Sequence, residues 1–237
     1  MSEVRIALDT ASDRLSVAVQ AGVGPVAQRS IRGARRHAAS LLPLATEALS
    51  EIGAHPGDIT AVVLADGPGS FTGLRVGAAF AKALTVTGQV ELSVTPSLLV
   101  RAAGGADGAQ RILAMSPAMR GEVYAGVWEF APQIVTEIVA PRAFTVDALV
   151  NLPRAERVVG EGPDPVRQAL ADAWGVQPEE GWPQASTMLG LVALCGGTRV
   201  VEDPEGWEPS YGRPAEAQAR WEREHGRSLP DSPGHSR

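Results

Sequence analysis

Residues 66–75 read Asp-Gly-Pro-Gly-Ser-Phe-Thr-Gly-Leu-Arg and lie between a strand-like apolar stretch and a helix-like segment. A glycine-rich turn at such a junction can leave backbone N–H groups at a helix start, where a phosphate or carboxylate binds. The same glycines can instead let the helix approach a neighbouring backbone closely. The first interpretation predicts a nucleotide-using enzyme, with Gly67, Gly69 and Ser70 as cofactor-binding candidates. The second predicts a scaffold, and the residues leave both open.

Asp9 and Thr10 end the first strand-like run, residues 4–10. A carboxylate and a hydroxyl at a strand end can orient a magnesium-bound phosphate. Alternatively, Asp9 caps the turn towards Ser12 and Asp13. The turn is the favoured interpretation, and the metal–phosphate site is its alternative.

Other chemistries lack their required residues. A Walker-type loop needs a lysine beside its glycines, and the first lysine of the chain is Lys82. Ser70 lacks the Gly-x-Ser-x-Gly environment of a nucleophilic serine. The chain has one cysteine, Cys195, and no His-x-x-x-His pair, so neither a disulfide nor a metal site is expected. We therefore predict no catalytic residue and no metal ligand.

The elements around these residues predict an α/β protein that opens with an antiparallel meander of strands at 4–10, 15–20 and 26–31. A doubly wound nucleotide-binding fold usually opens with strand, glycine loop and helix, which argues against that fold. A helix is expected at about 38–52, with Pro43 in its first turn or else as a kink. Residues 60–65 are apolar on both faces, which predicts a central strand. Thr72 is the expected N-cap of a helix running to about Thr87.

The rest of the chain predicts a second group of strands and helices. A glycine cluster near residue 104 favours a boundary between a domain at 1–104 and another at 105–214. Residues 215–237 are rich in Pro, Gly and charge, which predicts a disordered tail. The remaining expected elements are strands at 90–95, 111–115, 122–129 and 134–139, and helices at 97–103, 145–150, 164–174 and 186–195, the last packing back on the first domain.

Composition excludes several classes of protein. The 237 residues carry a net charge of −6, whereas a chain that grips nucleic acid alone usually has an excess of cations. No stretch approaches a membrane span and no signal peptide is visible, so a cytoplasmic protein without membrane contact is expected. One basic cluster remains, which is either a solvated loop or a contact for RNA or an acidic partner. It comprises Arg29, Arg32, Arg35, Arg36 and His37.

Several motifs occur in the order found in one family. They are Ile6-Ala-Leu-Asp-Thr10, His37 with Leu41-Leu-Pro43, Gly67-Pro-Gly-Ser-Phe-Thr-Gly-Leu-Arg75, Gly121-Glu-Val-Tyr124 and Pro209-Ser-Tyr-Gly-Arg213. Over residues 3–213 the chain thus resembles the TsaB (YeaZ) family. The resemblance implies a two-lobed α/β fold of the actin, sugar-kinase and Hsp70-like (ASKHA) class, with mixed sheets flanked by helices. Departures at Ala11, Pro117, Met119 and Gly212 alter the pattern expected near the inter-lobe cleft.

The resemblance also implies a role in making N6-threonylcarbamoyladenosine (t6A) at position 37 of tRNAs that read codons beginning with adenine. The expected role is a non-catalytic dimerisation subunit that pairs with the catalytic TsaD subunit. The ATPase TsaE would complete the cycle, tRNA would be contacted through the complex, and a homodimer is possible for the isolated chain. ATP or ADP with Mg at the subunit junction is a possible cofactor, and an active nucleotide-dependent phosphotransferase or ATPase of the same fold is the alternative.

The family pairs through the two helices of the first lobe, here about 38–52 and 73–87. The expected contact residues are Leu41, Leu42, Ala45, Leu49, Thr72, Gly73, Arg75, Gly77, Ala78 and Ala81.

Overall fold

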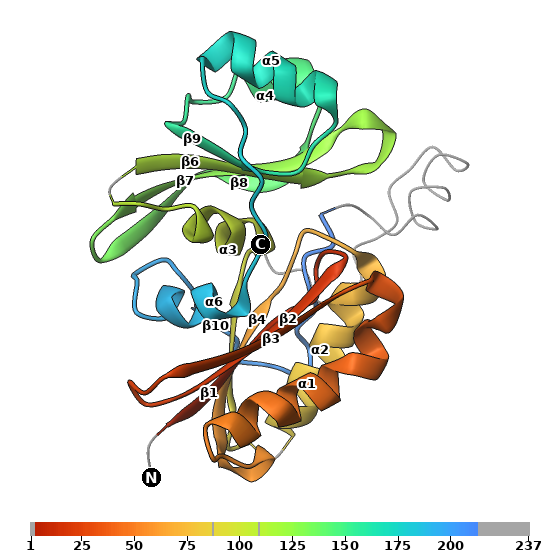
Figure 1. The fold of residues 1–237 in the computed structure, drawn as a ribbon, viewed down its shortest axis with the longest axis vertical. Coiled ribbons are helices and arrows are strands. Elements are labelled where there is room, and N and C mark those ends of the chain that lie inside the picture. Colours follow the sequence, from red (N-terminus) through yellow and green to blue (C-terminus); the bar gives the residue numbers. More distant parts are fainter. Residues whose placement is uncertain (1–2, 87, 109, 213–237) are drawn as a thin grey trace.

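Five layers of secondary structure alternate along the long axis of the molecule (Figure 1). The computed structural model describes residues 3–86, 88–108 and 110–212. Two helices cover one face of a six-stranded sheet, two further helices lie between that sheet and a four-stranded one, and a last pair covers the far side. Both sheets contain parallel and antiparallel neighbours, as predicted for this α/β class.

The six-stranded sheet has the order β10-β5-β4-β1-β2-β3. The first three strands form the predicted antiparallel meander, and β4 lies between β5 and β1 as its two apolar faces indicated. The strands are β1 (Val4–Asp9), β2 (Arg14–Ala21), β3 (Val26–Arg32), β4 (Ile59–Ala65), β5 (Glu91–Thr95) and β10 (Arg199–Val200).

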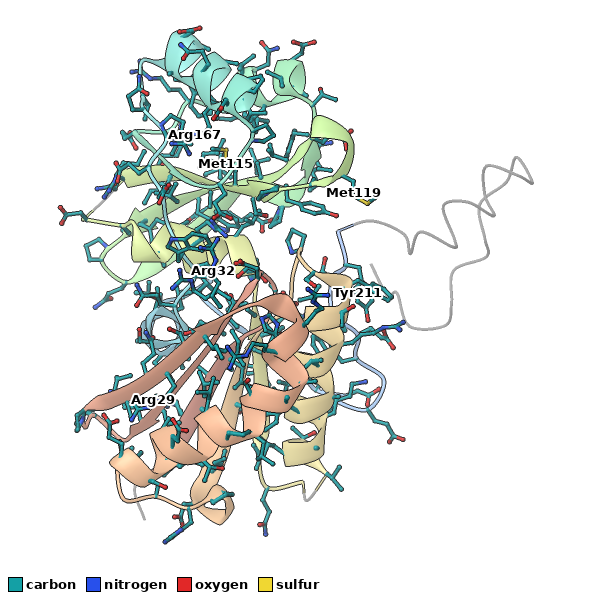
Figure 2. All side chains as sticks on the ribbon, turned by 45° about the vertical axis from the view of Figure 1, so that its right-hand side comes forward. Arg29, Arg32, Met115, Met119, Arg167 and Tyr211 are labelled. Carbon is teal, nitrogen blue, oxygen red and sulfur yellow. The ribbon has the colours of Figure 1, made fainter. Side chains whose placement is uncertain are left out.

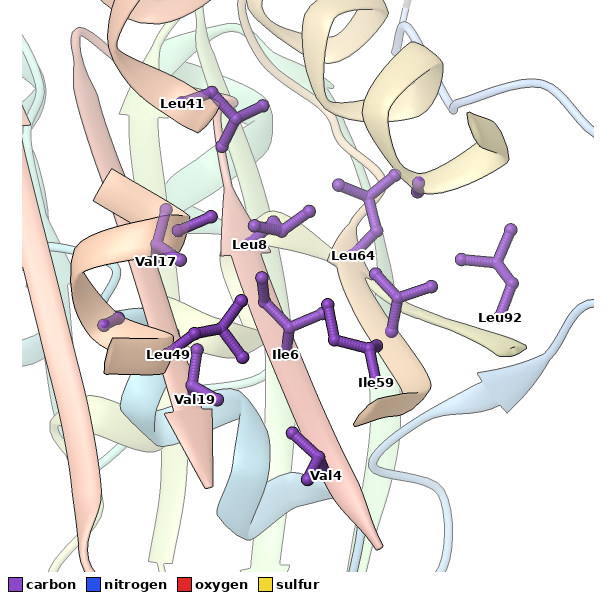
Figure 3. Close-up of a cluster of buried hydrophobic side chains, with 14 of the residues drawn as sticks. Val4, Ile6, Leu8, Val17, Val19, Leu41, Leu49, Ile59, Leu64 and Leu92 are labelled. Atoms are coloured by element: carbon purple, nitrogen blue, oxygen red, sulfur yellow. The ribbon is translucent and has the colours of Figure 1, made fainter. Parts of the chain in front are cut away.

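The helices α1 (His37–Glu51) and α2 (Phe71–Thr85) pack on one face of this sheet. Because strand side chains alternate, Ile6 and Leu8 point to the helices while Ala7 points to the opposite side. Figure 3 shows Leu41 and Leu49 of α1 lying over the strand side chains. The face turned towards α1 and α2 is therefore the core of the first half of the chain.

The middle layer consists of α3 (Ser97–Gly104) and α6 (Ala185–Leu191). Helix α6 packs on β1, β2 and β3, and α3 packs on β6, β7 and β9. Small residues of the first sheet and large ones of the second, such as Ala18 and Trp128, meet these helices in one apolar cluster. The middle helices thus join the two sheets.

The four-stranded sheet has the order β8-β7-β6-β9, and its outer face is covered by α4 and α5. Leu113 and Met115 point outwards to these helices, while Ile112 and Ala114 point to the middle layer. The elements are β6 (Gln110–Pro117), β7 (Val123–Ala131), β8 (Ile134–Phe144), β9 (Arg157–Gly160), α4 (Val146–Val150) and α5 (Asp164–Trp174). The described residues also contain three short 3-10 turns, η1 (Ala34–Arg36), η2 (Pro56–Asp58) and η3 (Met119–Gly121).

The segment before α6 is held to α3 by a hydrogen bond and to the first sheet by cation–π contacts. The Arg101 guanidinium donates to the Gly181 carbonyl at 2.6 Å. The Trp182 ring lies 4.5 Å from the Arg14 guanidinium carbon and 5.5 Å from that of Arg32. These contacts hold the chain where it returns from the second sheet to the first.

One local prediction about the helices is wrong, and for Pro43 one of the two predicted alternatives is excluded. Helix α1 starts at His37, so Pro43 lies inside the helix and on its exposed side, not in the first turn. Ser70, not Thr72, caps α2, because the Ser70 hydroxyl accepts a hydrogen bond from the Gly73 N–H. The predicted end at Thr87 lies outside the described residues, within which α2 ends at Thr85.

The domain limits at residues 104 and 214 stay a prediction. The chain after β9 returns to the first sheet through α6 and β10. The predicted tail, 215–237, lies outside the described residues. Over the described part of the chain, no helix combines the length and apolar character that crossing a membrane requires.

Candidate functional site

The glycine loop (residues 66–70) and the first turns of α2 press against the end of β1. A Cβ added at Gly69 would overlap the Ala11 carbonyl oxygen, and one at Gly73 would overlap that of Thr10. At Gly67, where φ is +115°, a Cβ would overlap the Ser210 carbonyl oxygen. The glycines therefore allow close backbone approach, the second of the two interpretations that the sequence left open.

Backbone N–H groups of the same loop are used inside the protein. Ser70 N–H donates to the Ala11 carbonyl at 2.6 Å, and Gly67 N–H donates to the Ser97 hydroxyl at 2.9 Å. Gly73 N–H donates to the Ser70 hydroxyl at 3.2 Å. These donors are not directed at a bound anion, so this part of the loop does not form a phosphate cradle.

Asp9 makes the predicted turn. Its Oδ1 accepts a hydrogen bond from the Ala11 N–H at 2.9 Å. Its Oδ2 and the Thr10 hydroxyl are buried without a hydrogen-bond partner among the described residues. Burial raises the pKa of the Asp9 carboxyl to about 6, and the Ala11 hydrogen bond and the Arg101 charge only partly oppose this.

These residues do not fit a magnesium nucleotide as they stand. Asp9 and Thr10 both have 0% exposure. The Thr10 hydroxyl lies against Gly77 of α2, where a Cβ would come within 2.5 Å of it. A metal-bound phosphate needs open oxygen ligands, and here protein covers them. Within 3–86, 88–108 and 110–212, no group of three His, Cys, Asp or Glu side chains is placed to hold a metal ion.

Asp66 is a second carboxylate at this junction, and its side chain is largely buried. Burial raises the pKa of its carboxyl to about 6, although the Arg199 guanidinium lies 3.9 Å away and opposes the shift. Its backbone N–H donates to the Thr95 carbonyl, and its carbonyl accepts from the Ser210 N–H at 2.8 Å. Asp66 thus ties the loop to β5 and to the C-terminal part of the chain.

Most of the predicted contact residues on α1 and α2 are buried within the chain itself. One stripe of each helix fills the core against the six-stranded sheet. The sequence could not distinguish this inner stripe from an outer one, because both are apolar. The role of these residues as partner contacts stays a prediction, and their burial argues against it; they are Leu41, Ala45, Leu49, Gly73, Gly77, Ala78 and Ala81.

The opposite stripes form an outer face, which we define as Leu42, Pro43, Thr46, Phe71, Thr72, Arg75, Ala79 and Ala83. All eight residues are exposed, and Leu42 and Phe71 have exposed fractions of 62% and 38%. Among the predicted contact residues, Leu42, Thr72 and Arg75 lie here, and they stay candidates. Phe71, Ala79 and Ala83 were not among the predicted contact residues, although together with Arg75 they recur every four residues along α2, which is a helical signal.

The C-terminal strap, residues 205–212, runs along α2. The Lys82 ammonium donates to the Glu205 carbonyl at 2.8 Å, and the partly buried Trp207 packs against the hydrophobic core of the first sheet. The Tyr211 ring lies 4.6 Å from the Phe71 ring, and the Arg75 guanidinium carbon lies 4.1 Å from the Phe71 ring centre. Figure 2 shows Tyr211 beside the start of α2.

The basic cluster around residues 29–37 is divided in space. Arg29 pairs with Glu51 at 2.5 Å and Glu47 at 3.6 Å, and Arg32 pairs with Asp13 at 2.9 Å. Figure 2 shows Arg29 and Arg32 well separated. His37 is buried, and burial lowers the pKa of its imidazole. Arg35 and Arg36 are exposed. The cluster is therefore not one continuous cationic patch.

Known proteins resemble most of the chain. The relative in Bacillus subtilis, "tRNA threonylcarbamoyladenosine biosynthesis protein TsaB", is 28% identical over 91% of this chain and 96% of its own. The Escherichia coli protein of that name is 35% identical over 50% of this chain and 52% of its own. A solved Pseudomonas aeruginosa structure, described as an uncharacterized protein with similarity to peptidase YeaZ, superposes with a TM-score of 0.74. It is 24% identical and covers 89% of this chain and 100% of its own, so it supports the fold alone.

The family model for "TsaD: tRNA N6-adenosine threonylcarbamoyltransferase" matches residues 15–188. The two mixed sheets flanked by helices and the superposition on the YeaZ-like structure confirm the predicted α/β fold. The chain therefore belongs to the TsaB (YeaZ) family.

Proposed function

We propose that this chain is a non-catalytic scaffold subunit that pairs with a TsaD-type transferase through the outer face of α1 and α2. In that pair the sister subunit transfers the threonylcarbamoyl group to N6 of adenosine 37 in tRNAs that read codons beginning with adenine. The relatives named for threonylcarbamoyladenosine biosynthesis support the pathway.

The observation that carries the proposal is the contrast between the two candidate sites. The polar residues at the end of β1 are sealed by protein, whereas the outer face is open and weakly polar. Residues 37–46 of α1 contain no Asp, Glu, Lys or Arg, and α2 carries only Arg75 and Lys82. A specific pairing buries roughly 1,200–2,000 Å² in total, which two helices per partner can supply.

The partner proposed for the outer face follows from the threonylcarbamoyltransferase family model that this chain matches. A transferase of the same family has the same layered fold, so its equivalent helix pair can meet this one across an approximate twofold axis. Without that partner, a second copy of this chain is the natural substitute, which yields a homodimer. Contact with tRNA then runs through the complex, with an ATPase subunit completing the cycle in the cytoplasm.

The test measures binding of the purified transferase by calorimetry. Leu42→Asp and Ala79→Arg place a charge on the outer face, and each is expected to weaken binding at least about 100-fold. Val23→Asp is the matched control, because Val23 is fully exposed in the turn between β2 and β3. The proposal fails if both outer-face variants bind with the affinity of the unmodified chain.

In cells, depletion of this protein is expected to remove t6A from tRNA. Nucleoside analysis of total tRNA by mass spectrometry measures this. An unchanged level of the modified nucleoside contradicts the pathway.

An active nucleotide-dependent phosphotransferase or ATPase is the second candidate, favoured by one observation. The Asp9 Oδ2 and the Thr10 hydroxyl have no hydrogen-bond partner among the described residues, as expected of groups that wait for a ligand. Calorimetry with ATP and Mg²⁺ distinguishes the candidates. Micromolar binding that is lost in Asp9→Ala favours the enzyme, and absence of binding favours the scaffold.

A further inference from the structure

Arg75 is held in place by two aromatic rings. Its guanidinium carbon lies 4.1 Å from the centre of the Phe71 ring and 6.0 Å from that of Tyr211. A cation this close to an aromatic face is attracted by the ring quadrupole. The Tyr211 hydroxyl donates to Glu208 at 3.2 Å, which fixes the ring that comes from the strap. The arginine is thus oriented before any partner arrives.

The N–H donors of Arg75 have no acceptor within the described residues. Its side chain is exposed, and no ion pair or hydrogen bond joins it to residues 3–86, 88–108 or 110–212. A guanidinium has five N–H donors in a planar fork that matches a carboxylate with two parallel hydrogen bonds. The Arg75 guanidinium therefore presents to the solvent N–H donors that no acceptor among the described residues uses.

Arg75 has no ion-pair partner at the start of its own helix. It is the fifth residue of α2, whose first turn holds no acidic residue. Its contact with the Phe71 ring orients the side chain but leaves the N–H donors of the guanidinium available.

We infer that Arg75 forms a bidentate ion pair with an Asp or Glu on the docking helices of the transferase subunit, and that Phe71 and Tyr211 are its positioning residues. This inference rests on the proposed function. Arg75 lies on the outer face four residues from Phe71 and from Ala79, so a partner helix on that face passes directly over it.

A protein carboxylate fits better than a nucleic-acid phosphate. Binding to a phosphate backbone needs several cations together. On α2 the other cation, Lys82, already donates to the Glu205 carbonyl, and residues 37–46 of α1 carry no Lys or Arg. One arginine within a weakly polar face is typical of a protein interface, where arginine is enriched.

The experiment compares the affinity of the purified transferase for variants of the full chain. Arg75→Ala is expected to weaken binding about 10- to 100-fold, and Arg75→Lys about 10-fold, because lysine keeps the charge but loses the fork. Arg142→Lys is the matched control, since the Arg142 guanidinium carbon lies 4.4 Å from the Phe144 ring on β8, away from the outer face. That control is expected to bind like the unmodified chain.

The carboxylate is then located by exchange of charges. Arg75→Glu is combined with Arg replacements of each Asp and Glu on the transferase's docking helices, and one pair is expected to recover at least about 10-fold of the lost affinity. A structural role of Arg75 would give no such recovery. If no pair recovers affinity, the inference is wrong.

The remaining outcomes separate the inference from the proposed function. If both Arg75 variants bind normally while Leu42→Asp does not, the ion pair is wrong and the pairing stands. If the unmodified chain does not bind the transferase, both fail. If Arg75→Ala leaves the pairing unchanged but weakens tRNA binding by the complex, Arg75 contacts a phosphate group. The inferred ion pair with a carboxylate of the transferase is then wrong.

Discussion

The inner and outer sides of α2 are built from the same short stretch of sequence, yet they differ in what touches them. On the inner side, Gly69, Gly73 and Gly77 lie against the backbone and side chains of Thr10 and Ala11. On the outer side, Phe71, Thr72 and Arg75 are exposed. The difference indicates that the glycines serve to seat the helix closely, while the residues between them are presented outwards.

The comparison also separates two kinds of polar group. Asp9 is buried, one of its carboxylate oxygens has no hydrogen-bond partner among the described residues, and burial favours the uncharged form. Arg75 is exposed, oriented by aromatic rings and charged. The fold thus covers one polar site with protein and exposes another, and the predictions below test the two sides separately.

The largest contrast is expected between two neighbouring leucines. Leu41→Asp buries a charge in the core and is expected to cost about 4 kcal/mol or more of unfolding free energy. Leu42→Asp is expected to change stability by less than about 0.5 kcal/mol, because Leu42 is exposed, and yet to abolish pairing. Chemical denaturation and calorimetry measure the two effects. Equal destabilisation by both variants would contradict the assignment of inner and outer stripes.

The next largest effect concerns the close contact between α2 and the chain at the end of β1. Gly73→Ala is expected to cost about 3 kcal/mol, because the new Cβ would overlap the Thr10 carbonyl oxygen and both backbones must move. Gly190→Ala in α6 is the control, since nothing lies within 4 Å of its added Cβ. It is expected to stabilise by up to about 1 kcal/mol. Thermal unfolding measures both, and an unchanged midpoint in Gly73→Ala would show that the contact is loose.

A smaller effect is the pH dependence contributed by Asp9. Its pKa of about 6 in the folded chain exceeds the usual value of 3.8. The folded state therefore holds this proton more tightly, so the contribution of Asp9 to stability is fully present below pH 3.8 and is lost as the pH rises through 6. The loss at neutral pH is at most about 3 kcal/mol.

Asp9→Asn keeps an oxygen for the Ala11 N–H but cannot ionise. Relative to the unmodified chain, it is expected to gain stability between pH 4 and 7, as measured by urea unfolding at several pH values. A constant difference across that range would show that the carboxyl titrates normally.

The smallest expected effect is that of Arg29→Ala. Its ion pairs with Glu47 and Glu51 are largely exposed, so the loss should not exceed about 1 kcal/mol. A similar affinity of the complex for tRNA is expected, because the pairing with two glutamates offsets the charge. A strong loss of tRNA binding would instead support the hypothesis that the basic cluster contacts RNA.

The sequence predicted most elements because their apolar periodicity is local. The meander, the central strand β4 and helices α1 and α2 follow from such patterns. Strands β9 and β10 were missed, since Arg199–Val200 is too short to show a period and depends on β5 for its pairing. The cap of α2 was placed two residues late, because Ser70 and Thr72 are both favourable N-cap residues and the sequence does not show where the helix begins.

The candidate site was predictable only in part. The motif around residue 70 indicated the loop, but its two interpretations differ in which atoms lie behind the glycines, and those atoms belong to Thr10, Ala11 and Ser210. Long-range contacts of this kind leave no local pattern. For the same reason, the packing of Tyr211 on Phe71 was not expected, since the two residues are joined only by the fold.

The most direct test of the account is threonylcarbamoyl transfer to tRNA, reconstituted with the purified transferase, the ATPase and this chain. The account predicts that Asp9→Asn supports transfer at close to the unmodified rate, while Leu42→Asp, though folded, supports almost none. The reverse result, with transfer lost in Asp9→Asn and retained in Leu42→Asp, would contradict it.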